Sequence, residues 1–245
     1  MDEIADQAII LELRPHGENH AVVHFLSAAH GHMAGFLFGG QGRRQQPNVQ
    51  PGNHVNFTLT YKILNQLGTL QLELLHNPSI GVLHDPARLA ALQFLCPLLS
   101  RALPEHAPHQ NLYRVVSEFL SRLAAPDWAL EYVRLEKTIL AEFGYGLDFS
   151  RCAMTNEQDV SRLAYVSPKT GRAATAEGAA GYEQNLFPLP KFMVCDAAAD
   201  NDDICAGLAI TGHFLERFLL EHRQQQILPT RMRLVSQFMR GRVAA

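Results

Sequence analysis

The first third of the chain alternates between apolar and polar residues, which is the pattern of half-buried strands. In residues 54–61, valine, phenylalanine, leucine and tyrosine occupy every second position, and polar residues fill the positions between them. Other short segments, rich in leucine, β-branched or aromatic residues, predict further strands at residues 8–13, 21–27, 32–38 and 67–75. Five such strands predict a small barrel of the OB type, and an SH3-like barrel fits the strand count nearly as well.

After residue 85 the apolar residues recur at spacings of three and four, the period of amphipathic helices. Asp85 and Pro86 predict the cap and the first position of a helix that runs toward Leu103 and is broken or kinked at Pro97. The same spacing predicts further helices around residues 112–123, 128–143, 204–219 and 229–239.

These patterns divide the chain into two parts. We expect an α+β protein, with an N-terminal OB-fold over residues 1–80 and a C-terminal all-α helical domain over residues 81–245. An irregular insertion is expected inside the helical domain at about residues 145–192, where the turn-rich segments SPKTGR and FPLPKF stand.

Composition fits a folded protein without membrane spans. Apolar residues make up 47% of the 245 residues, and no apolar run reaches the roughly 18 residues that cross a bilayer. The first residues are acidic, which argues against a signal peptide. The four cysteines form no CxxC pair, which suits a reducing compartment. We therefore expect a cytoplasmic protein that does not bind membranes.

Charge is distributed unevenly, although a net charge of -3 argues against a uniformly basic nucleic-acid binder. No acid occurs from residue 19 through residue 72, a span that holds Arg43, Arg44 and Lys62. Both arginines stand in GGQGRRQQPNVQPG, which its glycines predict to be a flexible loop and which is long for a connection between strands. A second acid-free stretch, residues 222–245, holds five arginines. Local positive potential of this kind is enough for salt-sensitive binding of phosphates.

Binding of a single strand needs cations for the phosphates and planar side chains for the bases. The arginine pair and Lys62 supply the cations, and Tyr61 and Phe36 are candidates for stacking on bases. Phe57 shares its face with aliphatic residues, so we expect it in the core instead.

Motifs for covalent chemistry are missing from the sequence. No GxxxxGK[ST], GxSxG or HExxH motif occurs, and the Lys-Thr-Gly within residues 167–171 has no SxxK nucleophile to accompany it. Close histidine pairs at 30/32 and 106/109 lack a second pair of ligands at useful spacing. We expect no enzyme, no catalytic residue, no cofactor and no metal. An enzymatic site within residues 145–192 has only the Lys-Thr-Gly segment in its favour.

Several segments, taken in order along the chain, share features with one bacterial family. They are LRPHGENHAVVHFLSAAHG, GGQGRR, LEKTILAEFGYGLDFSRC, LAYVSPKTGRA, FPLPKF, TGHFLERFL and LPTRMRLVSQF. Together they resemble the RecO family of recombination-mediator DNA repair proteins. The resemblance implies an OB-fold, a helical domain with a zinc-finger-like insertion, and a location at the nucleoid. It also implies binding to single- and double-stranded DNA, strand annealing, and cooperation with RecR in loading RecA.

The resemblance also suggests roles for individual residues. The arginine pair matches the family's basic loop, which is sparser here. Arg134, with Lys137 one helical turn later, resembles a position that binds the acidic C-terminal tail of single-stranded DNA-binding protein, and Arg233 is a further candidate for contacts with DNA. Cys152 stands where zinc-bearing relatives begin a CxxC pair, but Thr155 occupies the second position. The insertion is therefore expected to lack zinc, because one thiolate cannot close a tetrahedral site.

Two hypotheses from different classes follow. The leading one is a non-enzymatic DNA repair factor that binds and anneals single strands and acts with RecR to load RecA onto DNA covered by single-stranded DNA-binding protein. The alternative, favoured by the overall acidity, is an adaptor that binds no DNA and recognises an acidic peptide tail through the helical domain. Separate titrations with an oligonucleotide and with an acidic peptide distinguish the two.

Overall fold

The computed structural model describes residues 2–62, 66–219 and 227–243. They form a mixed α+β structure, as predicted. The chain divides into two compact units, the N-terminal unit Met1–Ala124 and the C-terminal unit Ala125–Ala245. The sequence-based division at residue 80 coincides with the end of the barrel strands and not with this boundary, because the first two long helices belong to the N-terminal unit.

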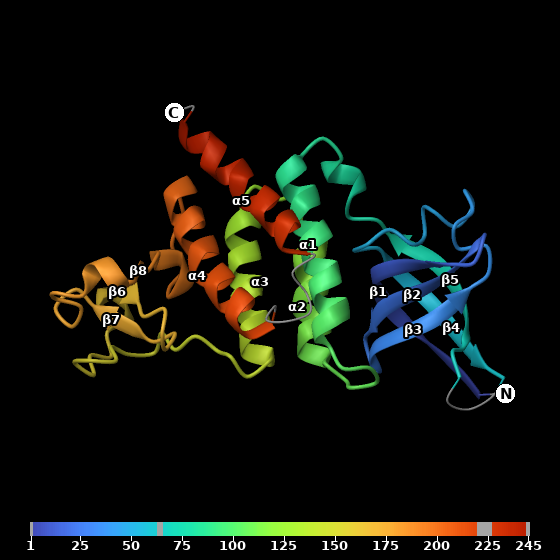
Figure 1. Cartoon of the computed structure of the whole chain (residues 1–245), viewed down its shortest axis with the longest axis horizontal. Helices are drawn as coiled ribbons and strands as arrows, with labels where there is room; N and C mark the ends of the chain where they lie inside the picture. The colour runs from blue at the N-terminus through green and yellow to red at the C-terminus, as the bar shows by residue number, and fades with distance from the viewer. Residues whose placement is uncertain (1, 63–65, 220–226, 244–245) are drawn as a thin grey trace. The chain divides into compact units, whose positions relative to one another are not determined.

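Five strands form a closed barrel in the N-terminal unit, in the order β1-β2-β3-β5-β4, and β4 pairs with β1 to close it (Figure 1). The strands are β1 (Asp2–His16), β2 (His20–Ser27), β3 (Gly31–Leu37), β4 (His54–Tyr61) and β5 (Thr69–His76). Neighbouring strands run antiparallel except β3 and β5, which are parallel. The five predicted strands and their closure into a barrel are confirmed.

β1 extends well beyond the predicted segment 8–13 because it pairs with two different strands. Its first part pairs with β4, beginning with Asp2 opposite Tyr61. Its last part pairs with β2 and ends with His16 opposite His20. The polar start of β1 carries no apolar alternation, so only the distant partner strand reveals that it is extended.

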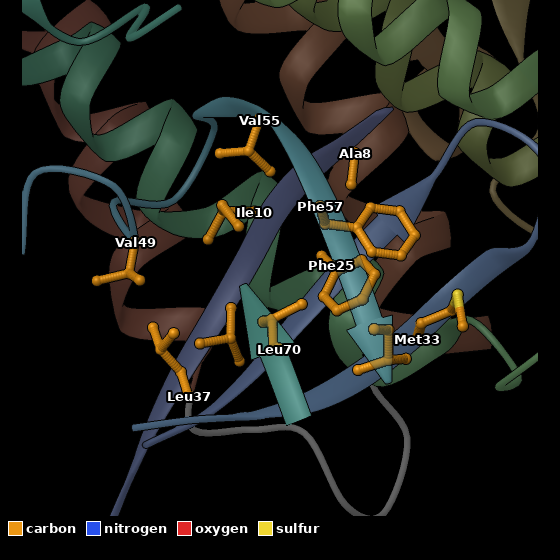
Figure 2. Close-up of a cluster of buried hydrophobic side chains, with 11 residues drawn as sticks. Ala8, Ile10, Phe25, Met33, Leu37, Val49, Val55, Phe57 and Leu70 are labelled. Atoms are coloured by element: carbon orange, nitrogen blue, oxygen red, sulfur yellow. The ribbon is translucent and has the colours of Figure 1, made fainter. Parts of the chain in front are cut away.

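Figure 2 shows the core of the barrel, to which every strand contributes buried side chains. The rings of Phe25 and Phe57 lie at its centre with their centroids 4.6 Å apart, which confirms the prediction that Phe57 is a core residue. Val49 comes from the long loop between β3 and β4 and is also buried in this cluster. The loop is therefore anchored to the barrel by an apolar side chain.

A short turn and two long helices complete the N-terminal unit. They are η1 (Ile80–Val82), α1 (Pro86–Ala102) and α2 (Gln110–Ser121). The predicted cap is confirmed, since Asp85 Oδ1 accepts the backbone N–H groups of Ala87 and Arg88, both at 3.0 Å. α1 is continuous through Pro97, so the predicted break does not occur. Apolar residues on both sides of Pro97 are buried, and α1 packs against β1 and β2, which holds the helix together.

The C-terminal unit contains three long helices, α3 (Trp128–Glu142), α4 (Asn201–Leu219) and α5 (Leu228–Val243). A buried ion pair joins them, with Arg231 Nη2 of α5 at 2.9 Å from Glu136 Oε2 of α3. Thr211 of α4 donates a hydrogen bond to the same carboxylate. Arg231 is one of the five arginines of the second acid-free stretch. Because it is buried and paired, it adds no positive charge to the surface.

The insertion contains a small sheet that the sequence did not predict. Its order is β7-β6-β8, with β6 (Leu163–Val166), β7 (Ala173–Thr175) and β8 (Phe187–Pro188), flanked by η2 (Val160–Arg162), η3 (Glu183–Asn185) and η4 (Lys191–Met193). Strands of two to four residues are too short to show alternation. The Lys-Thr-Gly segment forms the turn between β6 and β7, where Arg217 of α4 donates to the carbonyls of Pro168 and Lys169.

Cys152 is buried beside this sheet and is held by backbone donors. Its Sγ accepts the N–H groups of Thr155 at 3.4 Å and Thr175 at 3.3 Å. Gly178 packs so closely that a Cβ there would lie 3.0 Å from the sulfur. Burial opposes ionisation, but the hydrogen bonds from Thr155 and Thr175 outweigh it and lower the pKa of the thiol to about 6. Within the described ranges, no group of three or more histidine, cysteine, aspartate or glutamate side chains gathers around a possible metal position.

Candidate nucleic-acid interface

The loop between β3 and β4, residues 39–53, is named here the basic loop. It is hydrogen-bonded near both ends, whereas its glycines predict a flexible segment. At its start Gln41 Nε2 donates to the carbonyls of Gly17 at 3.2 Å and His20 at 2.8 Å. At its end Asn53 Nδ2 donates to the carbonyl of Pro47 at 2.7 Å. These hydrogen bonds are long-range or depend on side-chain amides, so the composition of the loop does not predict them.

Arg43 and Arg44 follow directly after the fixed start of the basic loop, and both are exposed. Across the described part of the chain, neither side chain has a hydrogen bond or an ion pair with another residue. The backbone beneath them is organised, since Gln45 N–H donates to the Gly42 carbonyl at 2.9 Å. The pair therefore presents two uncompensated cations on an ordered turn.

Four rings lie beside the start of the basic loop and form what we name the aromatic patch: His16, His20, Phe36 and Phe38. The Phe36 and Phe38 centroids are 4.9 Å apart at an interplanar angle of 78°. His20 lies 5.4 Å from both phenylalanine rings, and His16 lies 5.6 Å from Phe36. Phe38 is 60% exposed, an unusual position for a phenylalanine.

Strand register explains why these rings meet. His16 is opposite His20, and Val22 of β2 is opposite Phe36 of β3, so the rings occupy adjacent rows on the outer face of the barrel. Phe36 was a predicted stacking candidate, whereas the histidines and Phe38 were missed. Phe38 follows Phe36 by two positions, and this spacing on one face of the predicted strand was the available signal.

The other half of the outer face of β2 and β3, which carries His24 and His32, is buried. His32 Nδ1 lies 3.1 Å from the Leu103 carbonyl just after α1, and His24 Nδ1 lies 3.2 Å from His32 Nε2. Since the carbonyl can only accept, His32 donates from Nδ1 and accepts from His24. Burial lowers the pKa of both histidines, which keeps them neutral. The open part of the face is therefore limited to the end that carries the aromatic patch.

The two remaining candidates in the N-terminal unit lie at the end of β4. Tyr61 packs partly against the barrel core, and burial raises the pKa of its hydroxyl. It lines a groove of about 680 Å³ that also contains Asp2 and Glu105. Those carboxylates disfavour phosphate in the groove itself. Lys62 is exposed next to it.

Arg134 and Lys137 lie together on α3 and contact the turn at η4. Arg134 Nη2 donates to the Phe192 carbonyl at 3.0 Å, and its Nη1 pairs with Glu131 at 2.9 Å. Lys137 Nζ donates to the Met193 carbonyl at 3.0 Å, and burial, with the charge of Arg134 as a smaller cause, lowers the pKa of its ammonium group. Both side chains thus hold the insertion against α3, a role that the sequence did not suggest.

Arg233 is exposed on α5, where its Nη2 donates to Thr230 Oγ1 at 3.1 Å. It differs from its neighbour Arg231, which points into the unit and pairs with Glu136. Arg233 belongs to the C-terminal unit, whereas the basic loop belongs to the N-terminal unit.

Comparison with known sequences covers both units. The family described as Recombination protein O N terminal matches residues 1–78, and the one described as Recombination protein O C terminal matches residues 83–226. This chain belongs to the RecO family. The DNA repair protein RecO of Rhodospirillum centenum is 42% identical over 236 residues, which cover 96% of this chain and 94% of the relative. The DNA repair protein RecO of Rhodospirillum rubrum is 38% identical and matches 100% of this chain and 99% of its own.

Membership of the RecO family gives this chain a role in DNA repair and recombination. The resemblance read from the sequence is thereby confirmed. None of the described helices combines the length and apolar character needed to cross a membrane.

Proposed function

We propose that this RecO-family protein binds single- and double-stranded DNA, anneals complementary strands, and helps RecR to load RecA onto DNA covered by single-stranded DNA-binding protein. It acts in the cytoplasm at the nucleoid, by binding and without covalent catalysis. One observation carries the proposal: Arg43 and Arg44 are exposed and uncompensated on an ordered turn beside the open end of the barrel face.

We propose that the insertion in the helical unit is zinc-finger-like and that the barrel is an OB-fold. Its five strands close in the order β1-β2-β3-β5-β4, and OB-folds bind single strands on the face of strands 2 and 3 and on the adjoining loops. The aromatic patch lies on β2 and β3 and on the last residues of β1. The patch therefore occupies the place where an OB-fold holds its ligand.

Annealing follows from charge. Two strands repel each other through their phosphates, and cations that neutralise both backbones lower that repulsion while the bases find their register. With only two free arginines in the loop, the affinity is expected to be weak and to fall only moderately as the salt concentration rises. Each phosphate contact to a single strand contributes a slope of about -0.7 in log affinity against log salt.

Charge reversal in the basic loop tests the proposal. Arg43→Glu with Arg44→Glu is expected to weaken binding of both single- and double-stranded oligonucleotides and to slow annealing, without a change in the thermal melting of the protein. Arg114→Glu on α2 with Arg122→Glu, the exposed residue directly after that helix, changes the net charge equally and serves as the control. Unchanged binding by the loop variant at moderate salt contradicts the proposal.

The acidic tail of single-stranded DNA-binding protein is proposed to bind at Arg134 and Lys137. The two cations are adjacent, and Arg134 is 33% exposed, so part of its guanidinium remains accessible. A labelled acidic peptide titrated against the Arg134→Ala variant tests this. Because Arg134 also holds the Phe192 carbonyl, melting of the variant has to be measured alongside the affinity.

A further inference from the structure

We infer that the aromatic patch is a stacking site for one or two unpaired bases, and that it makes this protein prefer single strands over duplex. The inference rests on the proposed binding of DNA and adds to it the feature that the site recognises. The basic loop contacts phosphates, which both forms of DNA present, whereas the patch contacts base faces, which only unpaired nucleotides present.

Exposure of Phe38 is the first observation that supports a ligand. Burying a phenylalanine side chain is favourable in free energy, yet Phe38 is 60% exposed. The 11 apolar residues of the barrel core are buried. Its contacts to Phe36 and His20 are edge-to-face, at interplanar angles of 78° and 82°. The rings therefore do not stack on one another, and most of Phe38 remains available to a planar partner.

Rigidity of the patch is the second observation. Gly39 N–H donates to His20 Nδ1 at 3.2 Å, so neutral His20 carries its proton on Nε2 and the ring is held in one orientation. Gln41 then fixes the loop to the carbonyl of His20. The aromatic patch and the start of the basic loop are thus joined by hydrogen bonds through His20. Few side chains of the protein therefore have to become ordered when a strand binds.

Position relative to the arginines is the third observation. Phe38 precedes Arg43 by five residues, and the intervening turn is closed by the Gly42 N–H bond to the Gly39 carbonyl at 2.8 Å. A strand whose phosphates contact the arginine pair can place a neighbouring base on Phe38. The covered histidines at the other half of the face limit the site to a short run of bases.

Phe38→Leu tests the inference, because the residue is exposed and leucine keeps its apolar character. Stacking contributes enough per base that the variant is expected to bind a labelled oligo-dT at least about fivefold more weakly, with an unchanged affinity for duplex of equal length. Tyr182→Leu, which changes an equally exposed aromatic residue in the insertion, is the matched control and should alter neither affinity.

An abasic oligonucleotide of the same length provides a second readout. The wild-type protein should prefer oligo-dT over the abasic strand, and Phe38→Leu should lose most of that preference. Equal losses for single strand, duplex and abasic strand, or no loss at all, overturn the inference while leaving the proposed function intact. A wild-type protein that binds none of the three overturns the proposed function itself, and the inference with it.

Discussion

The buried ion pair of the C-terminal unit offers a quantitative test of how this unit is held together. Glu136 of α3 and Arg231 of α5 have side chains that are 1% and 7% exposed. Arg231 also donates to the Leu208 carbonyl of α4 at 2.7 Å. Burial by itself lowers the pKa of Arg231, but the charge and hydrogen bonds of Glu136 outweigh this and raise the pKa above its usual value. We take Arg231→Met, which removes the cation of this pair, as the perturbation.

The magnitude follows from what Arg231→Met leaves behind. The carboxylate of Glu136 would remain buried with the Thr211 hydroxyl as its only donor among the described residues. Removing one partner of a buried ion pair costs about 3–5 kcal/mol, because the other charge is left uncompensated. Replacing both partners by apolar residues, Glu136→Leu with Arg231→Met, is expected to recover most of that loss. In the double variant the Thr211 hydroxyl would donate its proton to the Gly207 carbonyl instead, which lies 3.1 Å away.

Urea unfolding followed by tryptophan fluorescence is a suitable assay. The chain has a single tryptophan, and Trp128 is buried in α3 with its ring centroid 5.7 Å from that of Phe238 in α5. The signal therefore reports on the C-terminal unit, even if the two units unfold separately. A loss below about 1 kcal/mol for Arg231→Met, or a double variant no more stable than the single one, would refute the reasoning.

Three further predictions concern single side chains. Gly212→Ala should destabilise the C-terminal unit by about 1–3 kcal/mol in urea unfolding, since a Cβ there would lie 2.2 Å from Arg231 Nη1, and Arg231→Met should relieve that clash. Gln41→Ala should weaken DNA binding about three- to tenfold by freeing the basic loop, without altering thermal melting of the barrel. The stability lost in Cys152→Ala should grow by about 1.4 kcal/mol per pH unit from pH 6 to pH 9, because the pKa of about 6 lies below the ordinary thiol value of 9.0. A loss in Cys152→Ala that does not change with pH would contradict the lowered pKa of this thiol.

Local sequence patterns were sufficient to predict the elements whose position depends on side chains close together in the sequence. β4 lies at its predicted residues because its apolar face is also its buried face. α1 begins where Asp85 and Pro86 indicate, because capping is an interaction between residues two or three positions apart. The first part of β1 and the sheet of the insertion escaped prediction because distant backbone partners, and not local alternation, make them extended.

The sequence was enough to establish the family, the barrel of five strands and the presence of acid-free stretches rich in arginine. Which of those arginines remain available was decided only by folding. Arg231 is neutralised by Glu136, which is 95 residues away in the chain, whereas Arg43 and Arg44 meet no carboxylate among the described residues. The aromatic patch is likewise assembled from three strands by their register. Pairing of charges and rings across such separations depends on tertiary contacts, which leave no periodic trace in the sequence.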